Sequence, residues 1–153
     1  MIPEIKYTYE EMPKATNYSE GTKIINGDKN EIRASIVGDV IYCTNDGIEL
    51  KLRLVYPENL EENKKYPLFM HVQGSAWMKQ NLSDHILDFK DVVTKGYILA
   101  IVEYRPSDVV KFPGQILDVK CAVRYIQNHS EELRVDLNNI FLSGDSSGGH
   151  TST

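Results

Sequence analysis

The sequence has 153 residues, 41% hydrophobic and 25% charged, which is enough for one domain with a substantial core and is typical of globular proteins. A formal net charge of -5 at pH 7 provides no basic patch, so we expect no nucleic-acid partner and no binding to acidic lipid. No apolar run approaches the roughly 18 residues that a membrane-spanning helix requires.

The N-terminal arm, residues 1–33, is polar and without clear periodicity, and residues 17–30 have the composition of a loop. Two roles for this arm stay open: a cover over a pocket or a frayed end. It has neither the basic start nor the apolar stretch of a signal peptide, so we expect a cytoplasmic protein. Cys43 and Cys121 lack metal or redox spacing, which predicts two buried free thiols and no metal site.

Order is expected from residue 34, beginning with a β-hairpin. Residues 36–43 form a plausible strand, and the turn at residues 44–47 contains Asp46-Gly47. Beyond it, apolar residues alternate with charged ones, at Ile48, Leu50, Leu52 and Leu54. Period-two alternation on one side of an Asp-Gly turn indicates a hairpin whose strand buries one face.

The pattern then changes to strands and helices in turn. Residues 67–72 and 97–102 are mostly apolar without alternation, as in parallel strands covered on both faces. A helix between them is predicted to be capped by Ser83 and ended by Gly96, with Ile86, Phe89 and Val93 along one face. A second helix is predicted to start at Pro113, with one apolar stripe at Ile116, Val119, Val123 and Ile126. The prediction is an α/β fold: a hairpin leading into a mostly parallel sheet, with helices on both faces.

The segment Gly144-Asp145-Ser146-Ser147-Gly148 follows an apolar run at residues 139–143. A strand that opens into G-x-S-x-G is the pattern of a nucleophile elbow, where a serine stands on a strained strand-to-helix turn. The glycines are needed because the residues two before and two after the serine approach closely. Ser146 is the predicted nucleophile rather than Ser147, because the residue two before Ser147 is Asp145, which carries a Cβ. The N–H of Ser147 is then placed to bind an oxyanion.

A Gly-Ser loop of this kind could also simply turn the chain or hold a phosphate, although it matches neither G-x-x-x-x-G-K-[ST] nor G-x-G-x-x-G. Two upstream segments favour the elbow: Gln73-Gly74-Ser75-Ala76-Trp77 after one strand, and Glu103-Tyr104-Arg105 at the end of the next. Together the three motifs resemble the α/β-hydrolase superfamily, in its esterase/lipase branch with the acetyl-esterase and feruloyl-esterase-like enzymes. The resemblance covers residues 34–153, so the expected domains are the arm 1–33 and a partial hydrolase domain 34–153.

The resemblance implies an oxyanion hole after the strand at 67–72. The family's His-Gly-Gly-Gly-Trp segment aligns with residues 73–77, where Gln73 replaces the histidine, and Ser75 and Ala76 replace two glycines. The backbone N–H groups of Ser75, Ala76 and Ser147 are the predicted donors, and Gly74 and Trp77 the predicted substrate contacts. Arg105 and Asp118 are expected to be scaffold residues, and no cofactor is implied.

Serine hydrolysis also requires a histidine and an acid, which follow the serine in this fold. No acid follows Ser146, and the histidines His71, His85, His129 and His150 do not occupy the family's catalytic position. We therefore expect a hydrolase truncated just after the elbow that hydrolyses esters poorly or not at all by itself. The exposed edge of the elbow strand would then be open to self-association.

Three functions remain open. The first is a serine hydrolase of carboxylic esters, acting on a small acyl ester such as an acetylated or feruloylated sugar. The second is a non-catalytic relic that binds a ligand or partner through the exposed sheet edge. The third is a peptidase of the prolyl-oligopeptidase type, which the short segment before the first strand disfavours.

Overall fold

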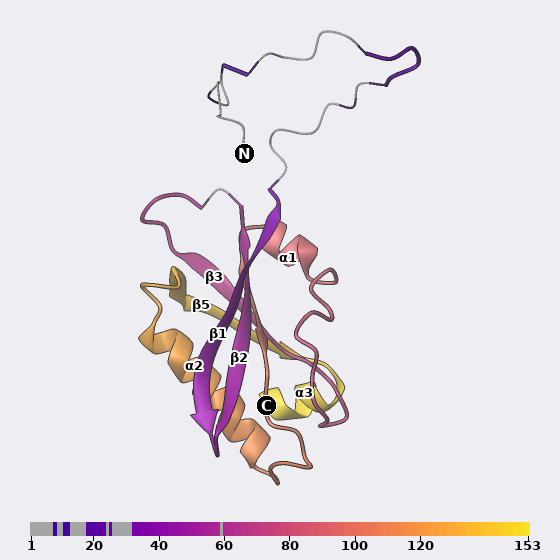
Figure 1. Cartoon of the computed structure of the whole chain (residues 1–153). Coiled ribbons are helices and arrows are strands. Elements are labelled where there is room, and N and C mark those ends of the chain that lie inside the picture. The colour runs from indigo at the N-terminus through magenta and orange to yellow at the C-terminus, as the bar shows by residue number, and fades with distance from the viewer. Residues whose placement is uncertain (1–7, 9–10, 13–17, 24, 26–31, 59) are drawn as a thin grey trace, which may run out of the picture. The chain divides into compact units, whose positions relative to one another are not determined.

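The computed structural model describes residues 8, 11–12, 18–23, 25, 32–58 and 60–153 (Figure 1). The chain divides into two units, Met1–Asn30 and Glu31–Thr153, which are described separately. The described part of the first unit contains a turn in which the N–H of Thr22 donates to the carbonyl of Ser19 at 3.1 Å. The predicted arm at residues 1–33 falls largely outside the described residues, so its boundary and its two possible roles stay predictions.

The second unit opens with the predicted hairpin. Strands β1 (Ala34–Asn45) and β2 (Ile48–Pro57) pair antiparallel and are joined by the two-residue turn Asp46-Gly47. Both turn residues have positive φ, 52° and 77°, which suits the right-handed twist of paired strands. The hairpin is confirmed, and β1 extends two residues beyond the predicted strand at each end.

Strand β2 joins the hairpin to the rest of the sheet, whose order is β1-β2-β4-β3-β5. The later strands are β3 (Tyr66–Val72), β4 (Ile98–Val102) and β5 (Val135–Gly144). β3 pairs in parallel with both β4 and β5, whereas β2 pairs antiparallel with β4. The predicted architecture of a hairpin followed by a parallel region is confirmed.

Two apolar layers cover the two faces of the sheet, with helix α1 (Lys90–Thr94) on one side and helix α2 (Gly114–Asn128) on the other (Figure 1). Strand β4 shows why its sequence lacks alternation: Ile98, Ala100 and Val102 enter the α2 layer, while Leu99 and Ile101 enter the α1 layer. All five are fully buried, as expected of a strand covered on both faces.

The first predicted helix was wrong over its first two turns. Residues 82–89 form successive turns, and α1 covers only Lys90–Thr94. His85 has φ +63°, in the left-handed region, which a right-handed helix cannot contain. Ser83 caps nothing; its hydroxyl accepts a hydrogen bond from Arg53 at 2.6 Å. The apolar face is nevertheless correct, because Ile86, Phe89 and Val93 all belong to the α1 layer.

Helix α2 agrees more closely with its prediction. Pro113 lies at the N-cap, one residue before the helix starts, and Val119 and Ile126 of the predicted stripe are buried. Cys43 and Cys121 are free thiols, half-buried rather than buried. Burial raises the pKa of the Cys43 thiol to about 11, so it is protonated at neutral pH.

Strand β5 lies at the edge of the sheet and pairs only with β3 among the described residues. Its apolar side chains Phe141 and Leu142 are 47% and 42% exposed. The predicted exposure of the elbow strand is therefore present in the structure. No helix in the described part of the chain is both long and apolar enough to cross a membrane.

Candidate active site

The candidate site lies where β3 and β5 end side by side. Val72 and Gly144, the last residues of the two strands, are register partners. Because parallel strands end at the same edge, the segment after β3 (Gln73–Met78, the β3 loop) lies beside the segment after β5 (Gly144–Gly148, the elbow). The sheet thus brings together two motifs that are about 70 residues apart in the sequence.

The elbow has the strained geometry that its motif predicts. Ser146 has φ +47°, a conformation that L-residues with side chains rarely adopt, and is the first residue of helix α3 (Ser146–Ser152). A Cβ on Gly144 would lie 2.5 Å from the backbone carbon of Gly148. A Cβ on Gly148 would lie 2.0 Å from the carbonyl oxygen of Val72. Glycine is therefore sterically required at both ends of the motif, as the sequence predicts.

Gly74 brings the β3 loop against the elbow. A Cβ there would meet the Asp145 carboxylate at 2.4 Å and the Cβ of Ser146 at 2.8 Å. The N–H of Gly74 donates to Oδ1 of Asp145 at 2.8 Å. Gly74 therefore approaches Ser146 closely, although its predicted contact with substrate stays a prediction.

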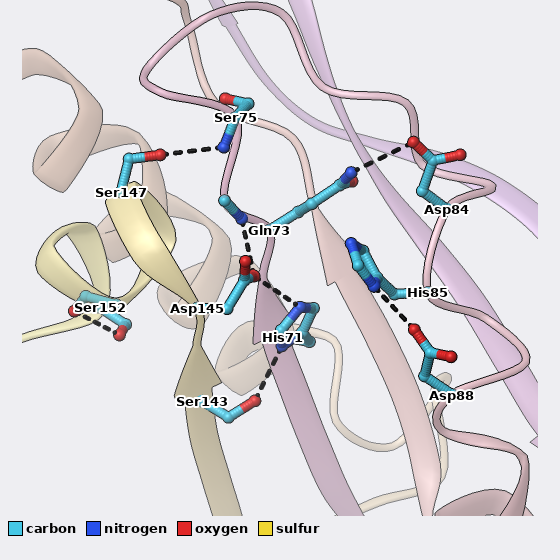
Figure 2. Close-up of polar contacts among 12 residues, drawn as sticks. His71, Gln73, Ser75, Asp84, His85, Asp88, Ser143, Asp145, Ser147 and Ser152 are labelled. Carbon is cyan, nitrogen blue, oxygen red and sulfur yellow. Dashed lines mark hydrogen bonds and ion pairs between the residues drawn. The ribbon is translucent and has the colours of Figure 1, made fainter.

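A second set of hydrogen bonds joins the same two segments through Ser147. Its hydroxyl oxygen accepts the N–H of Ser75 at 2.9 Å and the N–H of Trp77 at 3.2 Å. Figure 2 shows the bond between Ser147 and Ser75, with the Asp145 side chain nearby. Ser147 is only 3% exposed, whereas Ser146 is exposed. Of the two serines, Ser146 is the one accessible to a substrate.

The three predicted oxyanion donors differ in whether their N–H already has a hydrogen-bond partner. Among the described residues, no hydrogen-bond partner is found for the N–H of Ala76 or of Ser147. The N–H of Ser75 is already donated to Ser147, and the Ser75 hydroxyl is 2.6 Å from the carbonyl oxygen of Met78, to which it donates. Ser75 could bind an oxyanion through its N–H only if the bond to Ser147 opened.

Tyr104, which the sequence analysis did not identify as part of the site, supports the β3 loop from beneath. It is 1% exposed, and its hydroxyl donates to the carbonyl of Gln73 at 2.9 Å. The same hydroxyl lies 3.1 Å from the Ser75 hydroxyl and 3.4 Å from that of Ser147. Its place directly after β4, the neighbour of β3, was the signal that could have identified it.

His71 lies beneath the elbow rather than at Ser146. Its Nδ1 is 3.0 Å from the Ser143 hydroxyl, and its Nε2 is 3.3 Å from Oδ1 of Asp145 (Figure 2). The second pair is close but lacks the alignment of a hydrogen bond. Burial lowers the pKa of His71 below its ordinary 6.5, although the nearby Asp145 carboxylate opposes this effect. His71 is therefore a neutral packing residue near pH 7.

Arg105 and Asp118 have the structural connections expected of scaffold residues. The Arg105 guanidinium and its backbone N–H both donate to the carboxylate of Asp118, which is completely buried. Another guanidinium nitrogen donates to Asp46 in the hairpin turn at 2.6 Å. Hydrogen bonding to Asp118 raises the pKa of Arg105, so the guanidinium keeps its charge throughout the physiological range. It joins the end of β4, helix α2 and the hairpin.

A cavity of about 230 Å³ lies beside the elbow helix and is mostly apolar. Trp77, a predicted substrate contact, is part of its wall, together with Ser107, Phe112, Gln115, Ile116, His150 and Thr151. The His150 ring packs edge-on against Trp77, with centroids 5.7 Å apart. His150 is thus part of the cavity wall, and within the described residues no histidine is hydrogen-bonded to the Ser146 hydroxyl.

Residues 52–153 match the family model described as BD-FAE. The chain belongs to this family. The BD-FAE match begins in β2 and includes the β3 loop, Tyr104 and the elbow. The family is one of α/β-hydrolase esterases, as the sequence motifs predicted.

Individual relatives agree with the BD-FAE assignment. "Probable carboxylesterase 4, mitochondrial" of Arabidopsis thaliana is 30% identical over 86% of this chain and 38% of its own length. Carboxylesterase NlhH of Mycobacterium tuberculosis is 27% identical over 70% of this chain and 34% of its own. The solved esterase Est2 of Thermogutta terrifontis superposes with a TM-score of 0.70 at 25% identity, covering 74% of this chain and 41% of Est2. The chain spans less than half the length of these relatives.

Proposed function

We propose that this BD-FAE chain carries the nucleophile and oxyanion-binding part of a serine hydrolase of carboxylic esters. The observation that supports this most strongly is the position of Ser146: exposed, at positive φ, between two glycines that cannot carry a Cβ, and beside the β3 loop. A backbone this strained persists where its surroundings hold it and is common at reactive serines. The relatives named above are carboxylesterases, which favours an ester over a peptide substrate.

In the proposed reaction, the Ser146 hydroxyl oxygen attacks the ester carbonyl carbon, and its proton passes to a base. The N–H groups of Ala76 and Ser147 stabilise the oxyanion, and the alcohol then leaves with a proton. A water oxygen then attacks the acyl carbon, the bond to Ser146 breaks, the carboxylic acid leaves, and the Ser146 oxygen regains a proton. No described histidine is hydrogen-bonded to Ser146, so we propose that this chain alone turns over esters poorly or not at all.

The proposed substrate is a small acyl ester, with an acetylated or feruloylated sugar as the expected class. That class rests on the family resemblance. The cavity at Trp77 supports an apolar group on one side of the ester, because its wall is mostly apolar. We also propose that the protein acts in the cytoplasm.

The test is covalent labelling with excess fluorophosphonate, followed by mass mapping of the modified serine. We expect slow labelling confined to Ser146, absent in Ser146→Ala and unchanged in Ser152→Ala. Ser152 lies on the same short helix, and its hydroxyl donates to the Gly149 carbonyl at 3.0 Å. Labelling of another serine, or ester turnover that survives Ser146→Ala, would contradict the proposed nucleophile. Rapid turnover lost in Ser146→Ala would confirm the nucleophile and contradict the proposed low activity.

A second candidate is a binding module that associates through β5, which the exposed Phe141 and Leu142 favour. In that case copies of the chain would pair edge to edge through their unpaired backbone groups. Light scattering of Phe141→Lys against the unchanged chain tests it: a shift from dimer to monomer supports self-association, and a monomer in both excludes it.

A further inference from the structure

The Ser147 side chain forms contacts that a nucleophile elbow does not need from it. The proposed mechanism uses only its backbone N–H, yet its buried hydroxyl accepts two backbone N–H groups of the β3 loop, from Ser75 and Trp77. The Tyr104 hydroxyl lies 3.4 Å away, close enough to receive the proton of Ser147. These contacts join helix α3 to the β3 loop and to the residue Tyr104 that follows β4.

The β3 loop needs such support because its backbone is strained. Ala76 and Trp77 are consecutive residues at φ +52° and +58°, in the left-handed region that residues with a Cβ rarely adopt. Neither is glycine, so the strain must be offset by surrounding contacts. The two hydrogen bonds to Ser147 bracket Ala76, since they come from the residues on either side of it.

We propose that the Ser147 hydroxyl is a positioning group for the oxyanion hole. It fixes the N–H groups of Ser75 and Trp77. Ala76 lies between these two residues and is held so that the Ala76 N–H stays available to the oxyanion. Ser147 then has two roles. Its N–H donates to the oxyanion, and its hydroxyl holds the β3 loop that carries the second donor, Ala76. The catalytic part of this inference rests on the proposed ester hydrolase function; the structural part does not.

The opposite role is physically possible and gives the opposite result. If Ser75 N–H were an essential oxyanion donor, the Ser147 hydroxyl would compete with the oxyanion for it. Removing the hydroxyl would then release the donor and speed acylation. A positioning role predicts slower acylation, because a misplaced Ala76 N–H no longer meets the developing charge. The sign of the effect separates the two.

The structural test is amide hydrogen exchange by NMR on the full chain, comparing Ser147→Ala with the matched variant Ser152→Ala. We expect exchange at Ser75 and Trp77 to accelerate at least about 10-fold in Ser147→Ala only, since both amides lose their acceptor. Gly74 is an internal reference, because its N–H is held by Asp145 instead. Unchanged exchange at Ser75 and Trp77 would overturn the proposal. If Ser147→Ala does not fold, Ser147→Cys is measured in its place, because a thiol is a weak acceptor of similar shape.

The catalytic test is the rate of fluorophosphonate labelling at Ser146, with reversible binding and the bond-forming step determined separately. We expect Ser147→Ala to slow the bond-forming step about 10-fold with reversible binding unchanged, and Ser147→Thr to restore part of the rate. An unchanged or faster step in Ser147→Ala would overturn the positioning role. Labelling that survives Ser146→Ala would instead defeat the proposed function, and amide exchange would still decide whether Ser147 holds the loop.

Discussion

The hairpin turn and the elbow each hold a residue with a side chain at positive φ, Asp46 at 52° and Ser146 at 47°. Their surroundings differ. A Cβ added to Gly47 would have no heavy atom within 4 Å, whereas one added to Gly148 would lie 2.0 Å from a carbonyl oxygen of β3. Glycine is therefore favoured in the hairpin by its own backbone torsion. In the elbow it is required by the closeness of a neighbouring strand.

This difference separates a conformation that the local sequence chooses from one that the tertiary structure imposes. Asp-Gly favours the hairpin turn in any chain, because both residues tolerate positive φ. Ser146, Ala76 and Trp77 have no such preference, and all three lie in the candidate site. Three strained residues therefore lie where the proposed chemistry takes place, and His85 and Arg134 have positive φ elsewhere in the chain.

The substitution Gly148→Ala tests most strongly whether the elbow glycine is constrained by the neighbouring strand. We expect it to lower the free energy of unfolding by about 3 kcal/mol or more, because the new Cβ overlaps a backbone carbonyl that cannot move without distorting β3. Urea denaturation measures it. The matched control is Gly149→Ala on the same helix, where a Cβ would lie 3.2 Å from the nearest atom and alanine favours the helix. Equal losses in both variants would show that the elbow is not specifically constrained at Gly148.

Two substitutions that change only the fit of a residue to its backbone torsion should have smaller effects on stability, and the two effects should have opposite signs. Gly47→Ala is expected to destabilise the protein by about 1 kcal/mol, since the site is open and only the positive φ opposes alanine. Ala76→Gly is expected to stabilise it by about 0.5 kcal/mol, the relief of strain less the entropy of glycine. Urea denaturation of both variants is the measurement. A loss in Ala76→Gly would mean that the alanine methyl makes contacts worth more than its strain.

The smallest effect is the pH dependence that comes from His71 beneath the elbow. Its pKa is lowered in the folded state, so the unfolded chain binds the proton more readily. Stability is therefore expected to fall as the pH drops below about 6.5 and to stop falling below the folded-state pKa. The charge of Asp145 favours the protonated His71 ring, and His85 disfavours it. NMR titration of the His71 ring checks this, and a midpoint at or above 6.5 would contradict it.

Much of the fold follows from local patterns. The hairpin, the buried strands and the apolar faces of the helices were predictable because alternation and turn residues act over a few positions. The start of α1 was not predictable, because no residue type near His85 indicates the left-handed backbone found there. The predicted helix over residues 83–95 had the correct buried face and the wrong regular structure, since the apolar stripe reports burial rather than hydrogen bonding.

The sequence by itself determined that Ser146 stands in an elbow pattern between Gly144 and Gly148, because that motif is written in five consecutive residues. Only the tertiary structure decided that the Ser147 hydroxyl binds the β3 loop, that Tyr104 supports that loop, and that His71 lies at Ser143 instead of Ser146. Each of these contacts joins residues that lie in, or shortly after, different strands. Their partners are set by the parallel register of β3 with β4 and β5, which no short stretch of sequence specifies.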